Sequence, residues 1–278
     1  MNQKMTDLLW QDQTVWLIGA STGIGLATAK ALYLKGAKVV VSARKEKALT
    51  EFVMAHPADE NKNLHQPLAI ALDVLDLPAV QHASRQISQT IGLDRVVYCA
   101  GIYEPLKASN WQLSIMKQHV EVNYVGLLNV LDAVLPLWLK TNNSLSNCDL
   151  SASKIINPHL SIISSVAGYI GLPNSMAYGP TKAALINLAE TLYLDLKTFN
   201  IDVSLINPGF VETPLTAQNQ FKMPALITSE NAAQFILQGW QKGSFEIHFP
   251  KRFTMWLKLL KTLPYTLQFW AVKKFTGV

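Results

Sequence analysis

Short apolar runs alternate along the chain with longer segments of helical spacing. Residues 14–19 (TVWLIG) are apolar and β-branched, which predicts a buried strand, and residues 24–34 predict a helix that stops at Gly36. The strand pattern returns at residues 38–42, 68–72, 93–99, 160–164, 202–206 and 245–249. Long helical stretches lie at residues 115–139 and 178–199, and the polar stretch 141–158 predicts a surface loop. This alternation predicts an α/β protein with a doubly wound parallel sheet of about seven strands.

The length and composition fit a single domain. The 278 residues are 49% hydrophobic and 15% charged, which provides a large core and excludes global disorder. The apolar residues 127–139 are interrupted by an aspartate and a proline, which favours a buried helix over a membrane span. A secretory signal is not expected, and the two cysteines, Cys99 and Cys148, do not suggest a disulfide framework. A cytoplasmic protein is therefore expected.

A glycine-rich turn joins the first predicted strand to the first helix, and it reads Gly19-Ala20-Ser21-Thr22-Gly23-Ile24-Gly25. Gly19 can make the tight turn, Gly23 lets the backbone approach a phosphate, and Gly25 lets the helix pack on the sheet. The free amides and the positive end of the helix dipole would then face a pyrophosphate. The GxxxGxG spacing differs from the common GxGxxG, but its strand–turn–helix context predicts nucleotide binding.

The end of the second strand indicates which nucleotide binds. It reads Ser42-Ala43-Arg44-Lys45 and contains no acid. An acid there would bind ribose hydroxyls, whereas Arg44 can bind a 2′-phosphate with help from Ser42. NADP(H) is therefore the expected cofactor, with a merely solvated Arg44 as the alternative. Asp73 and Val74 close the third strand and are expected near the adenine, although Asp73 also suits a helix cap.

Several polar residues fall where catalytic groups are expected. Tyr178 and Lys182 are four residues apart at the start of a predicted helix, so they share one face. Because an ammonium stabilises a phenolate, this pair suits acid–base chemistry on a substrate oxygen. Ser164 and Ser165 end the fifth strand, where α/β active sites collect. Asn123 lies inside a predicted helix, where the alternative reading is an exposed polar position.

Taken in order, these motifs resemble the short-chain dehydrogenase/reductase family over residues 13–215. The family's serine lies thirteen residues before its tyrosine, which selects Ser165 rather than Ser164. The resemblance implies a Rossmann-like, NADP(H)-dependent oxidoreductase that moves a hydride between nicotinamide and a carbonyl or secondary alcohol. It implies cofactor contacts at Gly19, Ser21, Thr22, Gly23, Ile24, Gly25, Ser42, Arg44, Asp73, Val74, Ala100, Gly101, Tyr178, Lys182, Pro208, Gly209, Val211 and Thr213.

The resemblance also implies four catalytic roles. Tyr178 would be the acid in reduction and the base in oxidation, and Ser165 would hydrogen-bond the substrate oxygen. Lys182 would lower the pKa of the tyrosine and hold the nicotinamide ribose, while Asn123 would hold a water of the proton relay. One departure stands out, because Cys99 replaces an asparagine of the family pattern. An inert buried thiol is expected there, with a reactive thiol as the alternative.

The expected partners are a small-molecule substrate and further copies of the chain. The resemblance implies a homodimer or homotetramer built largely from the long helices. The six histidines show no metal-ligand spacing, so no metal site is expected. Positive charge is concentrated in the tail and no nucleic-acid motif is present, so no nucleic acid is expected. Apolar residues between Leu215 and Ile227 favour an apolar substrate.

The last residues form a separate feature. Residues 1–250 are expected to form the nucleotide-binding domain with the catalytic site, and residues 251–278 a basic helical tail without acids. One helix is expected to carry Phe253, Trp256, Leu257 and Leu260, and a second, beginning at Pro264, to carry Leu267, Trp270 and Ala271. This tail is either an appendage packed on the protein or a surface for peripheral membrane contact.

Two other functions remain open beside a carbonyl reductase. One is a non-catalytic NADP-binding sensor or scaffold, because a fold does not guarantee chemistry. The presence of both Tyr178 and Lys182 favours the enzyme over that alternative. A peripheral membrane reductase of lipid metabolism is the other alternative, and it rests on the tail and on the apolar segment after the sixth strand.

Overall fold

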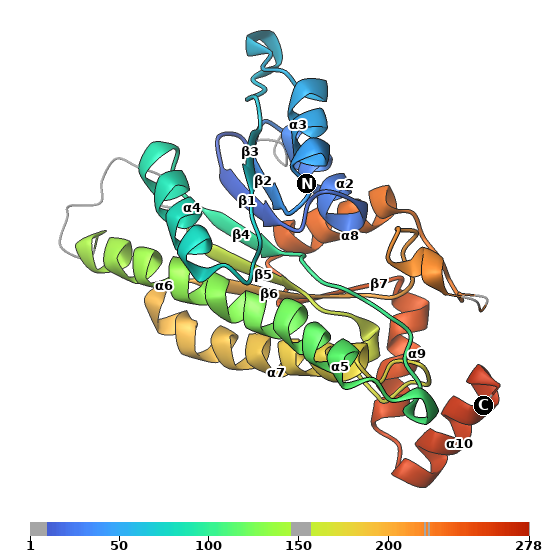
Figure 1. Cartoon of the computed structure of the whole chain (residues 1–278). Helices are drawn as coiled ribbons and strands as arrows, with labels where there is room; N and C mark the ends of the chain where they lie inside the picture. Colours follow the sequence, from blue (N-terminus) through green and yellow to red (C-terminus); the bar gives the residue numbers. More distant parts are fainter. Residues whose placement is uncertain (1–9, 146–156, 220, 222, 278) are drawn as a thin grey trace.

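The protein is built around one sheet of seven parallel strands. The computed structural model describes residues 10–145, 157–219, 221 and 223–277. The strand order is β3-β2-β1-β4-β5-β6-β7 (Figure 1), which confirms the doubly wound parallel sheet. The strands are β1 (Thr14–Ile18), β2 (Lys38–Ala43), β3 (Leu68–Ala71), β4 (Arg95–Tyr98), β5 (His159–Ile163), β6 (Asp202–Pro208) and β7 (Glu246–Phe249).

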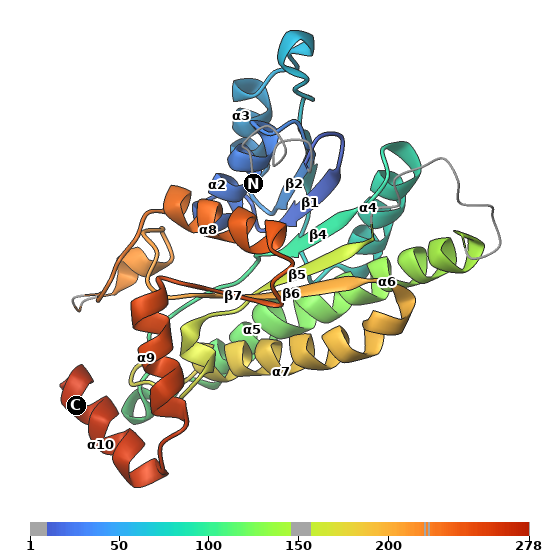
Figure 2. The same cartoon turned by 180° about the vertical axis from the view of Figure 1, so that it is seen from behind.

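Helices cover both faces of this sheet. One buried core lies beneath α4, α6 and α7, and a second lies beneath α2, α3 and α8 (Figures 1 and 2). The longer helices are α2 (Gly23–Tyr33), α3 (Glu46–Ala55), α4 (Leu77–Thr90), α5 (Leu113–Val120), α6 (Gly126–Leu145), α7 (Tyr178–Leu196), α8 (Ser229–Gln241), α9 (Lys251–Lys261) and α10 (Tyr265–Thr276). Short helical turns are η1 (Glu60–Lys62), η2 (Ala108–Asn110), η3 (Glu121–Val125), η4 (Val166–Gly168), η5 (Lys197–Phe199) and η6 (Thr216–Gln218).

The central strand β1 shows why these apolar runs form a two-sided sheet. All five of its residues are buried. Successive side chains point to opposite faces, so Trp16 and Ile18 enter one core while Val15 and Leu17 enter the other. A strand that is covered on both faces must be apolar throughout, which explains its unbroken apolar run.

The long helical stretch differs in detail from the expectation. A turn of π-helix, η3, separates α5 from α6, and α6 continues to Leu145, into the stretch expected to be a loop. Residues 146–156 of that expected loop lie outside the described residues. By length and composition alone, Leu113–Lys140 could cross a membrane, but half of its most apolar window is buried inside the protein. Core helices of soluble proteins pass the same test.

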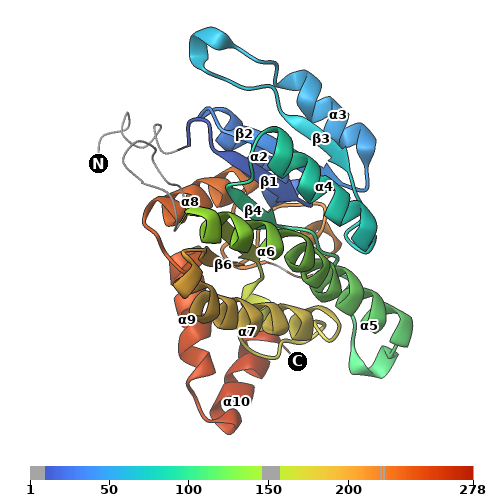
Figure 3. The same cartoon turned by 90° about the vertical axis from the view of Figure 1, so that its left-hand side faces the viewer.

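The order of the strands fixes where a ligand can bind. The chain winds outward from β1 through β2 to β3, then returns to the other side of β1 as β4. The crevice at the carboxyl ends of β1 and β4 is therefore the switch point at which doubly wound sheets bind ligands. Helix α9 begins directly after β7, at the same edge of the sheet, and α9 and α10 lie together at one end of the molecule in all three views (Figure 3).

Candidate active site

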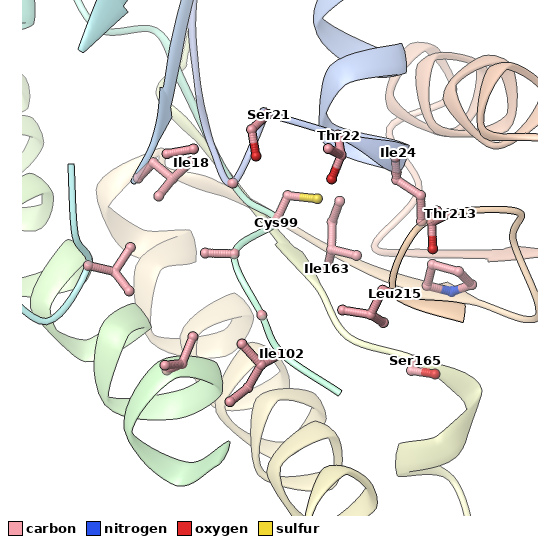
Figure 4. A pocket seen from close by; sticks show the side chains of 18 of the residues that line it. Ile18, Ser21, Thr22, Ile24, Cys99, Ile102, Ile163, Ser165, Thr213 and Leu215 are labelled. Carbon is pink, nitrogen blue, oxygen red and sulfur yellow. The ribbon is translucent and has the colours of Figure 1, made fainter. Parts of the chain in front are cut away.

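A cavity of about 560 Å³ opens at the switch point. Its volume suits a cofactor with a small substrate. Figure 4 shows side chains from β1, β5 and the segments that follow β1, β4 and β6 around one space. The predicted residues that line it are Gly19, Ser21, Thr22, Gly23, Ile24, Arg44, Asp73, Val74, Ala100, Gly101, Ser165, Tyr178, Lys182, Pro208, Gly209, Val211 and Thr213. The structure therefore brings together nearly all of the predicted site residues.

The glycine turn forms the floor of the cavity. Gly19 has φ +92°, and a Cβ there would lie 2.4 Å from the backbone nitrogen of Ala100, so only glycine fits between β1 and β4. Gly25 lies behind the turn, where a Cβ would meet the Gly19 carbonyl oxygen at 2.5 Å. Thr22 is the N-cap of α2 but makes no side-chain capping hydrogen bond. The first amides of α2 are thus left for another acceptor, which fits a phosphate.

The far end of the cavity carries positive charge, with one correction to the expected contacts. Arg44 and Lys45 line the wall where β2 ends, and Asp73 accepts a hydrogen bond from the Leu75 amide at 3.0 Å. Ser42 lies outside the cavity wall. Its hydroxyl is fully buried and accepts a hydrogen bond from the Trp16 indole at 2.9 Å. A strand residue alternates faces, so Ser42 points into the core, and the expectation that it contacts the cofactor is wrong.

The proton-transfer pair lies at the start of α7. Tyr178 and Lys182 share one face, with the Lys182 Nζ 5.3 Å from the centroid of the Tyr178 ring. The Lys182 Nζ donates to the Ile163 carbonyl at 3.0 Å, and burial lowers the pKa of this amine to about 8. Burial raises the pKa of the Tyr178 phenol above its usual value, and the hydrogen bond with Ser165 opposes that rise only in part.

This result differs from the expected lowering of the tyrosine pKa by Lys182. The lysine ammonium is directed toward the Ile163 carbonyl, and burial has the larger effect on the phenol. Tyr178 is therefore protonated at neutral pH. The protonated phenol is the form that donates to a carbonyl oxygen.

The two neighbouring serines have different roles. The Ser164 hydroxyl is buried and donates to the Lys182 carbonyl at 2.7 Å, which ties β5 to α7. Ser165 begins the turn η4, where its hydroxyl accepts a hydrogen bond from the Ala167 amide at 3.1 Å and lies at the cavity (Figure 4). Its position beside Tyr178 supports the choice of Ser165 as the residue that faces a substrate oxygen.

Asn123 is fully buried, so the alternative of an exposed polar position is wrong. It lies in the π-helical turn η3, a local irregularity that is frequent at functional sites. The Asn123 Oδ1 accepts from the Ile102 amide at 2.7 Å, and its Nδ2 donates to the Thr181 hydroxyl at 3.0 Å. Asn123 therefore connects the segment after β4 to α7, one residue before Lys182.

Cys99 lines the cavity as a free thiol (Figure 4). Burial raises the pKa of its thiol to about 11, so the reactive thiolate is scarce at neutral pH. A Cβ on Gly25 would lie 3.2 Å from its sulfur, so Cys99 fills space between the glycine turn and β4. This geometry favours the inert thiol over the reactive one.

A residue that sequence reasoning missed packs against the cavity residue Tyr178. The Tyr103 ring lies edge-on to that of Tyr178, with centroids 5.1 Å apart. Its hydroxyl donates to the Asn219 Oδ1 at 2.8 Å, across the cleft from the segment after β4 to the one after η6. Tyr103 carries no recognisable motif, and its partner is more than one hundred residues away. Only the folded structure shows that Tyr103 lies beside Tyr178.

A second missed cluster supports the segment that follows β6. The Glu246 carboxylate accepts hydrogen bonds from the Asn207 amide at 2.9 Å and from the Tyr169 hydroxyl at 2.5 Å, and it pairs with Lys258 of α9. Burial favours a raised pKa for Glu246, but these donors outweigh it and leave the pKa below its ordinary value. Because Asn207 precedes the cavity residues Pro208 and Gly209, this cluster holds the cavity wall.

Among the described residues, no group of three or more His, Cys, Asp and Glu side chains is arranged to hold a metal ion. The fold and site define a class of protein, the dinucleotide-binding oxidoreductases with a doubly wound sheet. The model of the short chain dehydrogenase family matches residues 13–223, more than half of the chain. The protein belongs to the short-chain dehydrogenase family.

Individual relatives agree with this assignment. The chain is 29% identical to an uncharacterized oxidoreductase of Myxococcus xanthus over 91% of its own length and 93% of that protein. It is 28% identical to dehydrogenase/reductase SDR family member 7B of Xenopus tropicalis over 74% of its length, and it spans 63% of that protein. A short-chain dehydrogenase from Sphingobium yanoikuyae, solved in complex with NADPH, has the same fold with a TM-score of 0.73 at 19% identity, covering 91% of this chain and 97% of that one.

Proposed function

We propose that the protein is an NADP(H)-dependent reductase of carbonyl compounds, acting on the carbonyl/secondary alcohol pair. The observation that carries this proposal is the convergence of Ser165, Tyr178 and Lys182 on a cavity floored by a glycine turn. A non-catalytic sensor would have no need of a protonated phenol beside an amine whose pKa lies near 8.

The residues fit a dinucleotide along the whole cavity. The uncapped amides of α2 suit a pyrophosphate, and the lack of a side chain at Gly19 lets the turn pack closely against the backbone of Ala100. Pro208, Gly209, Val211 and Thr213 line the other wall, where they would hold the nicotinamide end. A bound nicotinamide supplies or accepts the hydride.

The remaining chemistry is proton transfer by the chain's own residues. Tyr178 donates its phenolic proton to the substrate oxygen, and Ser165 donates a hydrogen bond that stabilises the charge developing on that oxygen. Lys182, with a pKa of about 8, can return a proton to the tyrosine near neutral pH. Asn123 fixes the segment after β4 to α7. We assign it the further role of holding a water molecule through which protons reach Lys182.

Preference for NADP(H) is supported by charge at the end of β2. Arg44 and Lys45 line the wall there, and the strand end carries no acid that would repel a 2′-phosphate. Arg44 is exposed at this wall, and its guanidinium can form a bidentate contact with such a phosphate. The similar Sphingobium dehydrogenase was solved with NADPH, in agreement with this proposal.

The substrate side suits an apolar carbonyl. Ile102, Ile163 and Leu215 line the cavity near Ser165 (Figure 4), and the Tyr103 ring packs against Tyr178. These side chains offer apolar surface around the hydroxyl groups that would bind the reacting oxygen.

The experiment is a titration of the purified protein with NADPH and NADH, followed by NADPH oxidation with ketones and aldehydes graded by size and apolarity. We expect tighter binding of NADPH and turnover that favours bulky apolar carbonyls. Tight NADPH binding without turnover of any carbonyl would contradict the reductase and support the sensor. Equal affinity for both cofactors would contradict the preference for NADP(H).

We further propose a cytoplasmic homodimer or homotetramer that is built from α6 and α7. Leu128 of α6 and Leu194 of α7 are 38% and 71% exposed, so these helices present apolar side chains for a partner copy. Sedimentation velocity should show a dimer or tetramer that Leu194→Glu weakens. A wild-type protein that sediments as a monomer would contradict this assembly.

A further inference from the structure

The helices α9 and α10 have an inner and an outer face. On the inner face, Leu257, Leu260, Ala271 and Val272 are all less than 10% exposed and join the core beneath α7. The Gln268 amide donates to the Leu260 carbonyl at 3.0 Å and fastens α10 to α9. The tail is therefore packed on the protein, as one of its two interpretations expected, but this packing uses only one side of each helix.

The outer face is strongly apolar. It carries eight of the twenty-two exposed large apolar side chains among the described residues, although the two helices form only a small part of the chain. We call this set the outer face: Met255, Trp256, Leu259, Tyr265, Leu267, Phe269, Trp270 and Phe275, which are between 45% and 74% exposed. Such a concentration of exposed aromatic side chains marks an interaction surface.

The apolar side chains of the outer face are continuous across both helices. The Trp256 ring of α9 lies edge-on to the Phe275 ring of α10, with centroids 5.8 Å apart. The Tyr265 and Phe269 rings stack 5.5 Å apart along α10. Figures 1 and 2 show these two helices at the outer end of the molecule, so this surface is accessible to a large partner.

Cations accompany this apolar surface. The chain contains no acid after Glu246, and its cations in this part are Lys251, Arg252, Lys258, Lys261, Lys273 and Lys274. Among the described residues, Lys258 alone of these six cations has a carboxylate partner, Glu246, and the other five cations are exposed. The Lys274 Nζ lies 5.0 Å from the centroid of the Trp270 ring, so charge and aromatic surface meet at the same place.

We propose that the outer face docks on the surface of an anionic lipid bilayer. Tryptophan, tyrosine and phenylalanine settle at the boundary between headgroups and acyl chains, and lysine and arginine side chains reach the acidic headgroups. Each cation near such a surface strengthens binding by electrostatic attraction. A second copy of the chain fits less well, because a two-fold interface would set the exposed cations of one outer face against those of the other.

The docked orientation places the catalytic cleft near the lipid. Phe253 of α9 packs against Phe210 in the segment after β6, with ring centroids 5.7 Å apart. Its ring would also lie 3.0 Å from a Cβ on the cavity residue Gly209. Helix α9, which carries part of the outer face, thus also contacts the cavity wall. If the proposed reductase function holds, apolar carbonyl substrates would be reached from the membrane.

The test is cosedimentation of the full-length protein with vesicles of phosphatidylcholine, alone or mixed with phosphatidylserine. We expect binding to the mixed vesicles, weakened about tenfold or more without phosphatidylserine or at high salt. The variants Phe269→Gln/Trp270→Gln and Lys273→Glu/Lys274→Glu should each lose about tenfold or more in vesicle affinity.

Matched controls separate this surface from a general loss of structure. Met54→Gln and Lys47→Glu change an exposed apolar residue and an exposed cation on α3, and they should bind vesicles like the wild type. All variants should keep NADPH affinity and turnover of a water-soluble carbonyl. Absence of turnover in every protein would refute the reductase while the vesicle result stood.

Three results would overturn the docking proposal. The first is that wild-type protein does not bind the mixed vesicles. The second is that the outer-face variants bind them as tightly as the controls do. The third is that the outer-face variants dissociate an oligomer in sedimentation velocity without changing vesicle binding, which would make a second copy the occupant.

Discussion

Replacement of Glu246 by glutamine tests whether the cluster beneath the cavity wall contributes to stability. The carboxylate has three donors, and the side chains of Glu246 and Lys258 are 24% and 32% exposed, so solvent screens the ion pair only in part. The substitution keeps the shape of the side chain but removes its charge. Hydrogen bonds to charged groups contribute about 1.5–3 kcal/mol each, whereas exposed pairs contribute less than 1 kcal/mol. A loss of about 2 kcal/mol is therefore expected, or about 3–4 °C in Tm for a chain of this length.

The pH dependence gives the sign of the effect. The folded-state pKa of Glu246 lies below its ordinary value of 4.5, so its stabilisation is fully present above that value and is lost as pH falls through the folded pKa. Urea unfolding of wild type and Glu246→Gln should thus differ at neutral pH and converge in acid. The double variant with Lys258→Met should lose less than the sum of the single changes. An equal Tm of wild type and Glu246→Gln at neutral pH, or additive losses of stability in the double variant, would refute the reasoning.

Three further substitutions test the cofactor and substrate walls. Arg44→Asp should weaken NADPH binding by about tenfold or more and NADH binding far less. The control Lys47→Asp on α3 should leave both affinities unchanged. Equal weakening of the affinities for NADPH and NADH would argue against a contact between Arg44 and the 2′-phosphate. Gly23→Ala forces a side chain onto a backbone with φ +56° and should weaken NADPH binding about tenfold in a fluorescence titration. An unchanged affinity would argue against a close approach of the cofactor to the Gly23 backbone. Tyr103→Phe removes the hydrogen bond to Asn219 and should raise the KM for the carbonyl with NADPH affinity intact; an unchanged KM would place the substrate elsewhere.

Much of the fold could be predicted from the sequence because its periodicities are strong. The strands of a parallel sheet are buried on both faces, so each gives an unbroken apolar run, as β1 does with all five residues buried. The glycine turn and the Tyr178–Lys182 pair are local motifs, and local motifs fix their own geometry. These features are sufficient to predict most of the cavity residues from the sequence.

Other features depend on long-range packing. The sequence showed a serine at a strand end, but only the fold shows that Ser42 faces Trp16 in the core. The π-helical turn around Asn123 leaves no periodic signal, and Tyr103 becomes a site residue through a contact with distant Asn219. In the tail, helical spacing grouped Trp256 with Leu257, yet packing buries only the leucine, because neighbouring helix positions point in different directions.

The measurement that tests the central claim most directly is turnover by Tyr178→Phe, compared with NADPH binding by the same variant. Because this change removes only the phenolic hydroxyl, NADPH affinity should stay close to that of wild type while carbonyl reduction falls about 100-fold or more. Tyr193→Phe makes the same change on the same helix, away from the cavity wall, and should keep full activity. Near-normal turnover by Tyr178→Phe would contradict the proposed proton donor and with it the mechanism.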